Sequence, residues 1–342
     1  HTKYIDLSVG STWLGHSTEF QDPARYDVKF RQYLLENPNE IPVGGYLEAR
    51  PFYSTTAYQK EGNSGPEYRS VHLGVDFWVE ATTAIHAPID GIVYSVYNND
   101  LYKDYGPTII LKHQTDSGIP FYSLYGHLSH SSLDLIQVGD HIKAGQQIGY
   151  IGALEENGHW PPHLHFQFIL DLLGNEHDFP GVCYPNEEKT WADICPDPNI
   201  LFQLPALKKM DQASTESVLE FRKKHLGKSL SLSYNQPLKM VRGDGQYLID
   251  DTGRKYLDTI NNVAHVGHEH QAVVRAGQTQ MALLNTNTRY LHENINLFAE
   301  ELLSTFPKEL SVVHFVNSGS EANELAIRMA KAYSAQKDIL AV

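Results

Sequence analysis

Short apolar runs separated by turn-forming residues occupy the sequence between residues 71 and 169, and they restrict this part of the chain to a β-rich fold. The runs are short for helices, and Gly, Pro, Asn and Asp stand between them, which is typical of strands joined by turns. We therefore predict a sandwich or barrel-like β domain. The clearest runs are residues 92–97, 108–111, 121–125, 147–151 and 163–169.

The composition excludes several classes of protein. The 27 Lys and Arg residues against 41 Asp and Glu give a formal charge of −14, which argues against partners such as nucleic acid or an anionic membrane. No apolar run approaches the ~18 residues of a membrane helix. The two cysteines, Cys183 and Cys195, are too few for a disulfide-stapled scaffold, and we expect them to be reduced.

The length of 342 residues suggests about two domains at ~150 residues each. The chain begins with an amphipathic stretch followed by turn-forming residues. A proline-rich segment then separates the β region from a final region with a different pattern of apolar and polar residues. The predicted parts are a leader (1–45), a β domain (46–200), a linker (201–216) and a second domain (217–342).

The second domain has the pattern of an α/β layer. A hairpin around residues 251–253, a helix over residues 291–303 and a buried strand over residues 312–316 suggest alternating strands and helices. The chain starts at His1 and ends in an apolar triplet, residues 339–341, typical of the start of a strand. We therefore expect a fragment of a longer protein.

Two pairs of polar residues in the β region suggest a metal site. His72 and Asp76 are four residues apart, and His163 and His165 are two apart. Residues at even spacing on a strand share a face, so each pair can point into one cleft. Two imidazoles and a carboxylate would form a catalytic zinc site with one position open for water, and a remaining imidazole can act as a general base. Either pair alone also occurs without a metal.

The same region resembles the lysostaphin/LytM-type zinc endopeptidases, which cut peptidoglycan cross-links or short Gly-containing peptides. The resemblance covers about residues 68–169 and implies a mainly antiparallel β domain of the LytM type, a duplicated hybrid motif. Six sequence blocks occur in the order of that family. They are His-Leu-Gly-Val-Asp-Phe (72–77), Ala-Pro-Ile-Asp-Gly (87–91), Tyr-Gly-His-Leu (125–128), Val-Gly-Asp-His-Ile-Lys-Ala-Gly-Gln (138–146), Ile-Gly-Tyr-Ile-Gly (148–152) and Pro-His-Leu-His-Phe (162–166).

This resemblance assigns roles to five residues. It implies that His72, Asp76 and His165 bind zinc. It also implies that His127 and His163 orient the nucleophilic water and stabilise the tetrahedral oxyanion.

One departure from the family pattern concerns the substrate. The family has small residues before its last block, whereas Trp160 stands there in this chain and is expected to narrow the mouth of the cleft. The chain has no His-Glu-x-x-His sequence, which excludes a thermolysin-type site. The histidines expected at the surface or in packing roles are His86, His113, His130, His141 and His159.

A second chemical signal is the turn Ser318-Gly319-Ser320, which follows the apolar run 312–316 and precedes a helical pattern. A strand, a Gly/Ser turn and a helix N-terminus can form a cradle for an anion, because free backbone N–H groups and hydroxyls converge there. The same turn is also common as a simple helix cap.

The chain from about residue 243 onward resembles the class-III aminotransferases, which are pyridoxal-phosphate enzymes of fold type I. The resemblance implies that Ser318, Gly319 and Ser320 hold the cofactor phosphate. It places Asn262 and Gly267-His268 near the substrate entrance. The family's Schiff-base lysine, its pyridinium-binding Asp and its ring-stacking aromatic residue lie beyond this turn. We therefore expect an incomplete α/β domain without a catalytic lysine. The matching blocks are residues 243–250, 255–258, 262–268, 285–290 and 317–323.

The leading hypothesis is a fragment of a multidomain enzyme, in which a zinc peptidase-like domain precedes part of a transaminase. The arrangement resembles a known bacterial fusion in which a small-molecule kinase-like domain precedes both. The alternative is a non-catalytic β scaffold or peptide-binding module attached to an aminotransferase or phospho-lyase with the whole activity. A third interpretation, a secreted cell-wall hydrolase, is disfavoured by the acidic charge and by the cofactor-dependent partner domain. We expect a cytoplasmic, homo-oligomeric parent protein that acts on a peptide or a small amine.

Overall fold

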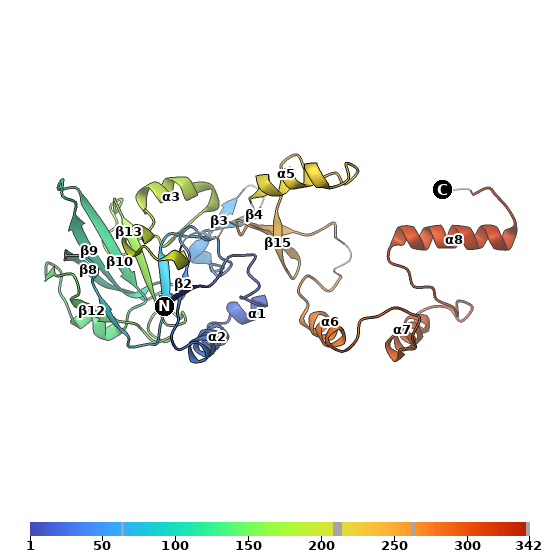
Figure 1. Ribbon diagram of the computed structural model, residues 1–342, viewed down its shortest axis with the longest axis horizontal. Helices are drawn as coiled ribbons and strands as arrows, with labels where there is room; N and C mark the ends of the chain where they lie inside the picture. The colour runs from blue at the N-terminus through green and yellow to red at the C-terminus, as the bar shows by residue number, and fades with distance from the viewer. Residues whose placement is uncertain (63–64, 208–213, 262–264, 340–342) are drawn as a thin grey trace. The chain divides into compact units, whose positions relative to one another are not determined.

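The computed structural model describes residues 1–62, 65–207, 214–261 and 265–339 (Figure 1). The chain divides into two compact units, His1–Gln271 and Ala272–Val342. Most of the β structure belongs to the first unit, whereas the described part of the second unit contains helices joined by irregular segments.

An eight-stranded sheet forms the centre of the first unit, with the order β1-β2-β6-β13-β10-β9-β8-β11. β1 and β2 are parallel, and the other neighbours are antiparallel. The sheet agrees with the predicted mainly antiparallel β domain. Its strands are β1 (Thr2–Tyr4), β2 (Ile41–Gly44), β6 (Val75–Trp78), β8 (Gly91–Asn99), β9 (Gly106–Gln114), β10 (Pro120–Gly126), β11 (His141–Ile142) and β13 (His163–Ile169).

Smaller elements surround this sheet. Four further sheets are present in the described residues: β5-β14, β7-β12, β3-β4 and β15-β16-β17. Their strands are β3 (Gln59–Gly62), β4 (Gly65–Tyr68), β5 (Val71–His72), β7 (Ala84–His86), β12 (Gln147–Tyr150), β14 (Val182–Cys183), β15 (Met240–Asp244), β16 (Tyr247–Asp250) and β17 (Lys255–Leu257). The helices of this unit are α1 (Ser17–Phe20), α2 (Pro23–Glu36), α3 (Glu188–Ile194), α4 (Asn199–Phe202) and α5 (Thr215–His225), with 3₁₀ turns at Thr56–Tyr58, His130–Asp134, Pro185–Glu187 and Pro205–Leu207.

The hydrophobic core lies on both faces of the central sheet. Successive residues of a strand point to opposite faces, so Ile109 and Leu111 pack in one cluster with Tyr125 and Phe166. Ile110 between them packs in a second cluster with residues that include Leu124, Ile169 and Phe179. Burial on both faces explains why Ile109, Ile110 and Leu111 follow one another without alternation in β9, and each such side chain contributes roughly 1.5–3 kcal/mol.

Residues 1–45 are built into this unit, although we expected them to be a leader. β1 and β2 extend the central sheet, and α2 begins at the N-cap Asp22, whose carboxylate accepts from the backbone N–H groups of residues 24 and 25. The buried face of α2 packs on the sheet, with the ring of Phe30 stacked on that of Trp78 at 4.8 Å. Short strands that pair in parallel leave little signal in a sequence, so this arrangement was not predicted.

The sheet β15-β16-β17 contains the predicted hairpin around residues 251–253 and also belongs to the first unit. Arg242 in β15 donates hydrogen bonds to the carbonyl oxygens of Val9, Ser11 and Gly15. The Ser70 hydroxyl donates to the carbonyl oxygen of Thr252 at 2.7 Å. These contacts join the hairpin to the N-terminal segment and to the residue before β5.

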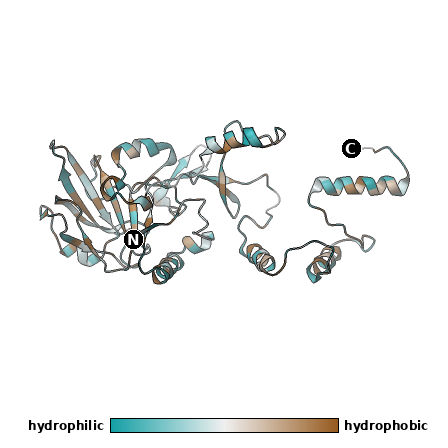
Figure 2. Ribbon diagram, in the orientation of Figure 1, coloured by the Kyte–Doolittle hydropathy of each residue, from teal (hydrophilic) through white to brown (hydrophobic). Residues whose placement is uncertain are grey.

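The second unit contains α7 (Glu293–Ser304) and α8 (Gly319–Ser334), and α6 (Gln271–Leu283) spans the boundary between the units. α8 carries polar and apolar residues along its whole length (Figure 2). The buried strand predicted over residues 312–316 is wrong: this segment is irregular, and Val312 is 77% exposed. A strand requires a hydrogen-bonded neighbour, and the described part of this unit offers none. Of the predicted strand start 339–341, residues 340 and 341 lie outside the described residues. No described helix has the length and apolarity needed to cross a membrane.

Candidate metal centre

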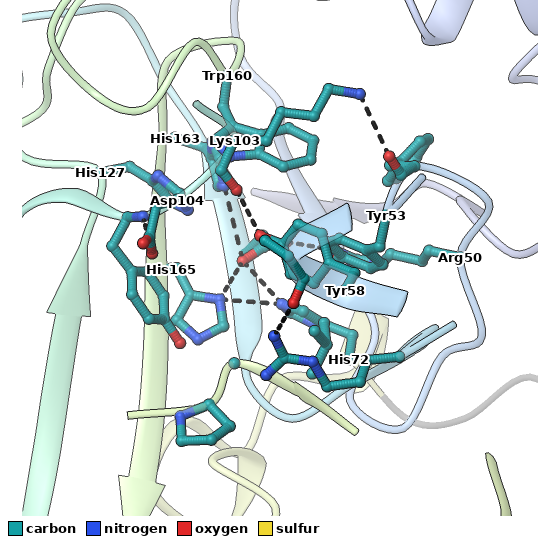
Figure 3. A pocket seen from close by; sticks show the side chains of 18 of the residues that line it. Arg50, Tyr53, Tyr58, His72, Lys103, Asp104, His127, Trp160, His163 and His165 are labelled. Carbon is teal, nitrogen blue, oxygen red and sulfur yellow. Dashed lines mark hydrogen bonds and ion pairs between the residues drawn. The ribbon is translucent and has the colours of Figure 1, made fainter. Parts of the chain in front are cut away.

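A cavity of about 130 Å³ in the first unit is lined by all five residues that the sequence assigned to the zinc site. Figure 3 shows the imidazoles of His72, His127, His163 and His165 converging within it. Asp76 lines the same cavity, and its Oδ1 lies 3.1 to 3.9 Å from ring nitrogens of His72, His163 and His165.

Strand register brings these residues together. Asp76 in β6 lies directly opposite His165 in β13, and Gly126 at the end of β10 lies opposite His165 on the other side. His127 therefore follows β10 into the cavity, while His72 enters from the end of β5. The even spacing of His163 and His165 places both on one face of β13, as predicted.

Three donor atoms form a compact group at the centre of the site. His72 Nε2 lies 3.0 Å from His165 Nδ1, and Asp76 Oδ1 lies 3.1 Å from His165 Nδ1 and 3.3 Å from His72 Nε2. All three residues are buried, and the three atoms satisfy the mutual distances that a single metal ion requires of its ligands.

Hydrogen bonds on the outer side of each imidazole determine where its proton lies. His72 Nδ1 is 3.1 Å from the carbonyl oxygen of Gly45, which only accepts, so Nδ1 donates and Nε2 carries the lone pair. Gln167 Nε2 donates to the carbonyl oxygen of Pro180, which orients its Oε1 toward His165 Nε2 at 3.0 Å. His165 Nε2 therefore donates, and its Nδ1 lone pair points at Asp76 and His72.

His127 and His163 are held in the same way but at the side of the site. His127 Nδ1 donates to the carbonyl oxygen of Asn157 at 2.9 Å, and His163 Nδ1 donates to that of Pro161 at 2.7 Å. Their ring centroids are 4.3 Å apart. Burial lowers the pKa of both imidazoles. Each therefore keeps a free Nε2 lone pair near the cavity, a state suited to accepting a proton.

The charge state of the three central residues suits a metal. Burial, followed by the charge of Arg50, lowers the pKa of His72 to about 4. Burial alone would raise the pKa of Asp76, but its neighbours, among them the charged Arg50 that donates to Oδ2, hold it well below its usual range. Near neutral pH the group thus offers a carboxylate and a neutral imidazole, the protonation states that bind metals.

Aromatic side chains and one lysine form the rest of the cavity wall. Trp160 is 8% exposed, packs against Phe52 and Tyr53 and lines the cavity. That it narrows the mouth of the cleft stays a prediction. The Lys103 ammonium lies 5.5 Å from the centroid of the Trp160 ring, and burial lowers its pKa to about 8. Sequence reasoning missed Arg50 and Lys103, because both lie far from the histidine blocks in the chain.

The remaining histidines of the β region have no place in the site. His113 is buried and bonds to the Asp90 carbonyl oxygen and to the Ser123 hydroxyl. Four others, expected at the surface, are exposed: His86, His130, His141 and His159.

The turn Ser318-Gly319-Ser320 is the start of α8. Ser318 is its N-cap, whose hydroxyl accepts from the Glu321 N–H at 3.1 Å, and Glu321 in return accepts from the Asn317 N–H. The backbone N–H groups of the first helical turn lack helical acceptors, as they do at every helix start. Asn262 lies outside the described residues. His268, 2.8 Å from a carboxylate oxygen of Asp258, packs beside the β15–β16 turn.

Comparisons with known proteins divide the chain in the same places. The profile of the family described as Peptidase family M23 matches residues 70–176, and that of Aminotransferase class-III matches residues 231–341. An M23 peptidase-like region therefore precedes an aminotransferase-like region in this chain.

Two curated relatives and one solved structure give examples. "Alanine--glyoxylate aminotransferase 2-like" of Drosophila melanogaster is 50% identical over 38% of this chain and 26% of its own length. "Ethanolamine-phosphate phospho-lyase homolog 1" of Caenorhabditis elegans is 41% identical over 39% of this chain and 28% of its own. The catalytic domain of the antimicrobial peptidase lysostaphin from Staphylococcus simulans is 26% identical over 34% of this chain and 77% of its own, with a TM-score of 0.25.

The chain thus spans about a quarter of the length of these curated relatives. Because both come from animals, the expected bacterial origin stays a prediction.

Proposed function

We propose that this chain, in which an M23 peptidase-like region precedes part of a class-III aminotransferase-like region, hydrolyses peptide bonds with zinc in its first unit. The single observation behind this proposal is the convergence of three atoms that can bind a metal, His72 Nε2, His165 Nδ1 and Asp76 Oδ1, within 3.3 Å of one another.

The donor set fits a zinc ion. The outer hydrogen bonds of His72 and His165 turn unprotonated nitrogens toward each other and toward a carboxylate oxygen. Three lone pairs at this spacing repel one another unless a cation lies among them. Two imidazoles and a carboxylate are the usual protein ligands of catalytic zinc, and they leave one position for water.

The residues of the chain would then have two separate roles, metal binding and proton transfer. When bound, zinc supplies a Lewis acid for a peptide carbonyl and a water of pKa about 7. His72, Asp76 and His165 hold the metal, and His127 and His163 act at their free Nε2 atoms. One of these Nε2 atoms would accept the proton released by the attacking water, its N–H would then donate to the oxygen on which negative charge develops, and the proton would pass to the nitrogen of the leaving amine.

Metal content and peptide cleavage test this function together. The purified protein should contain about one zinc per chain and cleave a glycyl or cross-link peptide, and His165→Ala should abolish both. His141→Ala, at an exposed histidine, is the matched control and should change neither. Protein without zinc would overturn the proposal. Stoichiometric zinc without cleavage of any such peptide would favour the alternative, a non-catalytic scaffold.

For the aminotransferase-like region, we propose that Ser318, Gly319 and Ser320 contribute the phosphate-binding part of a pyridoxal-phosphate site. The free N–H groups at the start of α8 support this assignment. Lys331 lies in the same helix, roughly 18 Å along its axis from residue 319, so it does not reach this turn. The names of the curated relatives suggest a small amino compound as substrate of the whole protein.

Location and assembly are part of the same proposal. A transaminase uses a cofactor and amino substrates that are available in the cytoplasm, and we place the parent protein there as a homo-oligomer. Its partners would be a peptide and a small amine.

A further inference from the structure

A chain of buried polar groups runs from the first strand to the ligand Asp76. The Tyr4 hydroxyl and the Leu7 N–H both donate to Glu48 Oε1, at 2.6 and 3.1 Å. Glu48 Oε2 accepts from Arg50 Nε at 2.7 Å, and Arg50 Nη1 donates to Asp76 Oδ2 at 2.5 Å. Glu48, Arg50 and Asp76 are 7%, 3% and 2% exposed.

Stability alone gives a weak reason for this arrangement. Removing three charged groups from water is costly, and buried ion pairs often contribute little net stability. Arg50 Nη2 is also buried without a hydrogen-bond partner among the described residues, which adds a further cost. Burial raises the pKa of Glu48, whereas the charge of Arg50 and the three donors described above favour its ionised form.

The arrangement instead fixes the orientation of Asp76. A guanidinium is planar and its N–H groups have fixed directions, so the contact with Glu48 determines where Nη1 points. Nη1 binds Oδ2 of Asp76, which leaves Oδ1 directed at His72 and His165. We infer that Glu48 and Arg50 are positioning residues for the metal ligand Asp76, and that Tyr4 makes the N-terminal strand part of the zinc site. This inference rests on the proposed zinc binding.

Electrostatics and geometry can be separated at this site. The positive charge of Arg50 repels a cation, and the negative charge of Glu48 attracts one. The double variant Glu48→Gln with Arg50→Met removes one charge of each sign, so the net charge near the metal is unchanged. Because Arg50 contacts Asp76 and Glu48 lies behind it, loss of both charges by itself favours a bound cation. A weaker zinc affinity therefore reports the lost orientation of Asp76.

The test is a zinc titration in competition with a chromogenic chelator, on the full chain. Loss of hydrogen bonds behind a metal ligand typically weakens metal binding about 10- to 100-fold, and we expect that loss in the double variant. Tyr4→Phe removes one hydrogen bond and should weaken binding by roughly threefold. The matched controls are Tyr33→Phe and Glu40→Gln, because Tyr33 also bonds to a glutamate of the N-terminal segment, at 2.7 Å, without a link to Asp76.

Two further measurements distinguish a change in ligand geometry from a loss of folding. The visible spectrum of the Co²⁺-substituted protein should change in the double variant and in Tyr4→Phe but not in the controls, since it reports ligand geometry rather than stability. Circular dichroism of the zinc-free proteins checks folding. If the double variant does not fold, Tyr4→Phe is decisive: affinity and spectrum equal to those of Tyr33→Phe would overturn the inference. Unchanged or tighter zinc binding in a folded double variant would also overturn the inference. A wild-type protein that binds no zinc would overturn the proposed function itself, and the inference about Asp76 with it.

Discussion

At the scale of single residues, the second nitrogen of each imidazole decides its role. Gly45 and Gln167 hold the outer nitrogens of His72 and His165, so their inner lone pairs meet at Asp76. The carbonyl groups that hold His127 and His163 direct their free nitrogens to the side of the three ligand atoms. The imidazoles proposed as ligands and those proposed as proton acceptors thus differ by where their hydrogen-bond partners lie, not by residue type.

His163→Ala separates the two roles. Because His163 is not one of the three central donors, we expect the variant to retain about one zinc per chain. It should lose peptide hydrolysis by about 10²- to 10⁴-fold, the usual contribution of a general acid–base group. Elemental analysis and initial rates on the same preparation measure both quantities. Loss of zinc together with activity would show that His163 is a ligand.

Asp104 lines the same cavity, and burial raises its pKa to about 6 from an ordinary value of 3.8. Its protonated form is therefore favoured in the folded state. The associated stability is complete below pH 3.8 and is lost as the pH rises through about 6. Asp104→Asn removes the ionisation and keeps an oxygen for the Tyr105 N–H.

We therefore expect Asp104→Asn to increase the free energy of unfolding by roughly 1–2 kcal/mol at pH 7.5, allowing for solvent screening. The gain at pH 4.5 should be about a third of that, because little of the carboxyl is then ionised in the folded state. Denaturant unfolding of the zinc-free protein at both values measures the difference, with the exposed Asp100→Asn as control. An equal gain at both values would contradict the shifted pKa.

At the scale of elements, the register between β6 and β13 creates the site, since it sets Asp76 opposite His165. The connection between β5 and β6 must pass close to β13. A Cβ on Gly74 would lie 2.6 Å from the carbonyl oxygen of Phe166 and 2.7 Å from the ring of His165. Only glycine allows this approach without moving His165 or the backbone of β13.

Gly74→Ala should therefore displace His165 or the β5–β6 connection. We expect a loss of stability of about 1–3 kcal/mol, as for other overpacked cores, and weaker zinc binding. Unfolding curves and chelator competition measure the two effects. Gly277→Ala is the control, because a Cβ there meets no neighbouring atom. Zinc affinity equal to that of the control would mean that the strands adjust elsewhere.

The elements also show what a sequence can reveal. The spacing of His163 and His165 predicted one strand face, and the strand bounds 163–169 were predicted correctly. The outer partners of the ligands were not predicted, because Gly45 and Arg50 reach the site through folding of distant segments. The spacing could have predicted Gln167 as a partner of His165, since it lies two residues later on the same face of the strand. The run 312–316 failed as a strand because an apolar pattern does not supply a pairing partner.

At the scale of the whole molecule, the compact units do not follow the family boundaries. The first unit extends to Gln271 and so includes the hairpin β15–β17, although the aminotransferase match begins at residue 231. Arg242 joins the two regions, since it bonds to three carbonyl oxygens of the N-terminal segment and to Glu269 at 2.8 Å. The hairpin turn also accepts a hydrogen bond from Ser70, two residues before the proposed ligand His72.

Arg242→Met should therefore destabilise the first unit rather than the hairpin alone. Its guanidinium bonds are charged, and their loss leaves partly buried carbonyl oxygens without donors, so we expect a decrease of roughly 2–4 kcal/mol in the free energy of unfolding. Hydrogen exchange should then increase in the N-terminal segment as well as in β15. Arg289→Met, at an exposed arginine of the second unit whose guanidinium bonds to Asn287, is the control. If exchange increased in β15 alone, the peptidase-like and aminotransferase-like regions would be independent, and the contacts of Arg242 would not couple them.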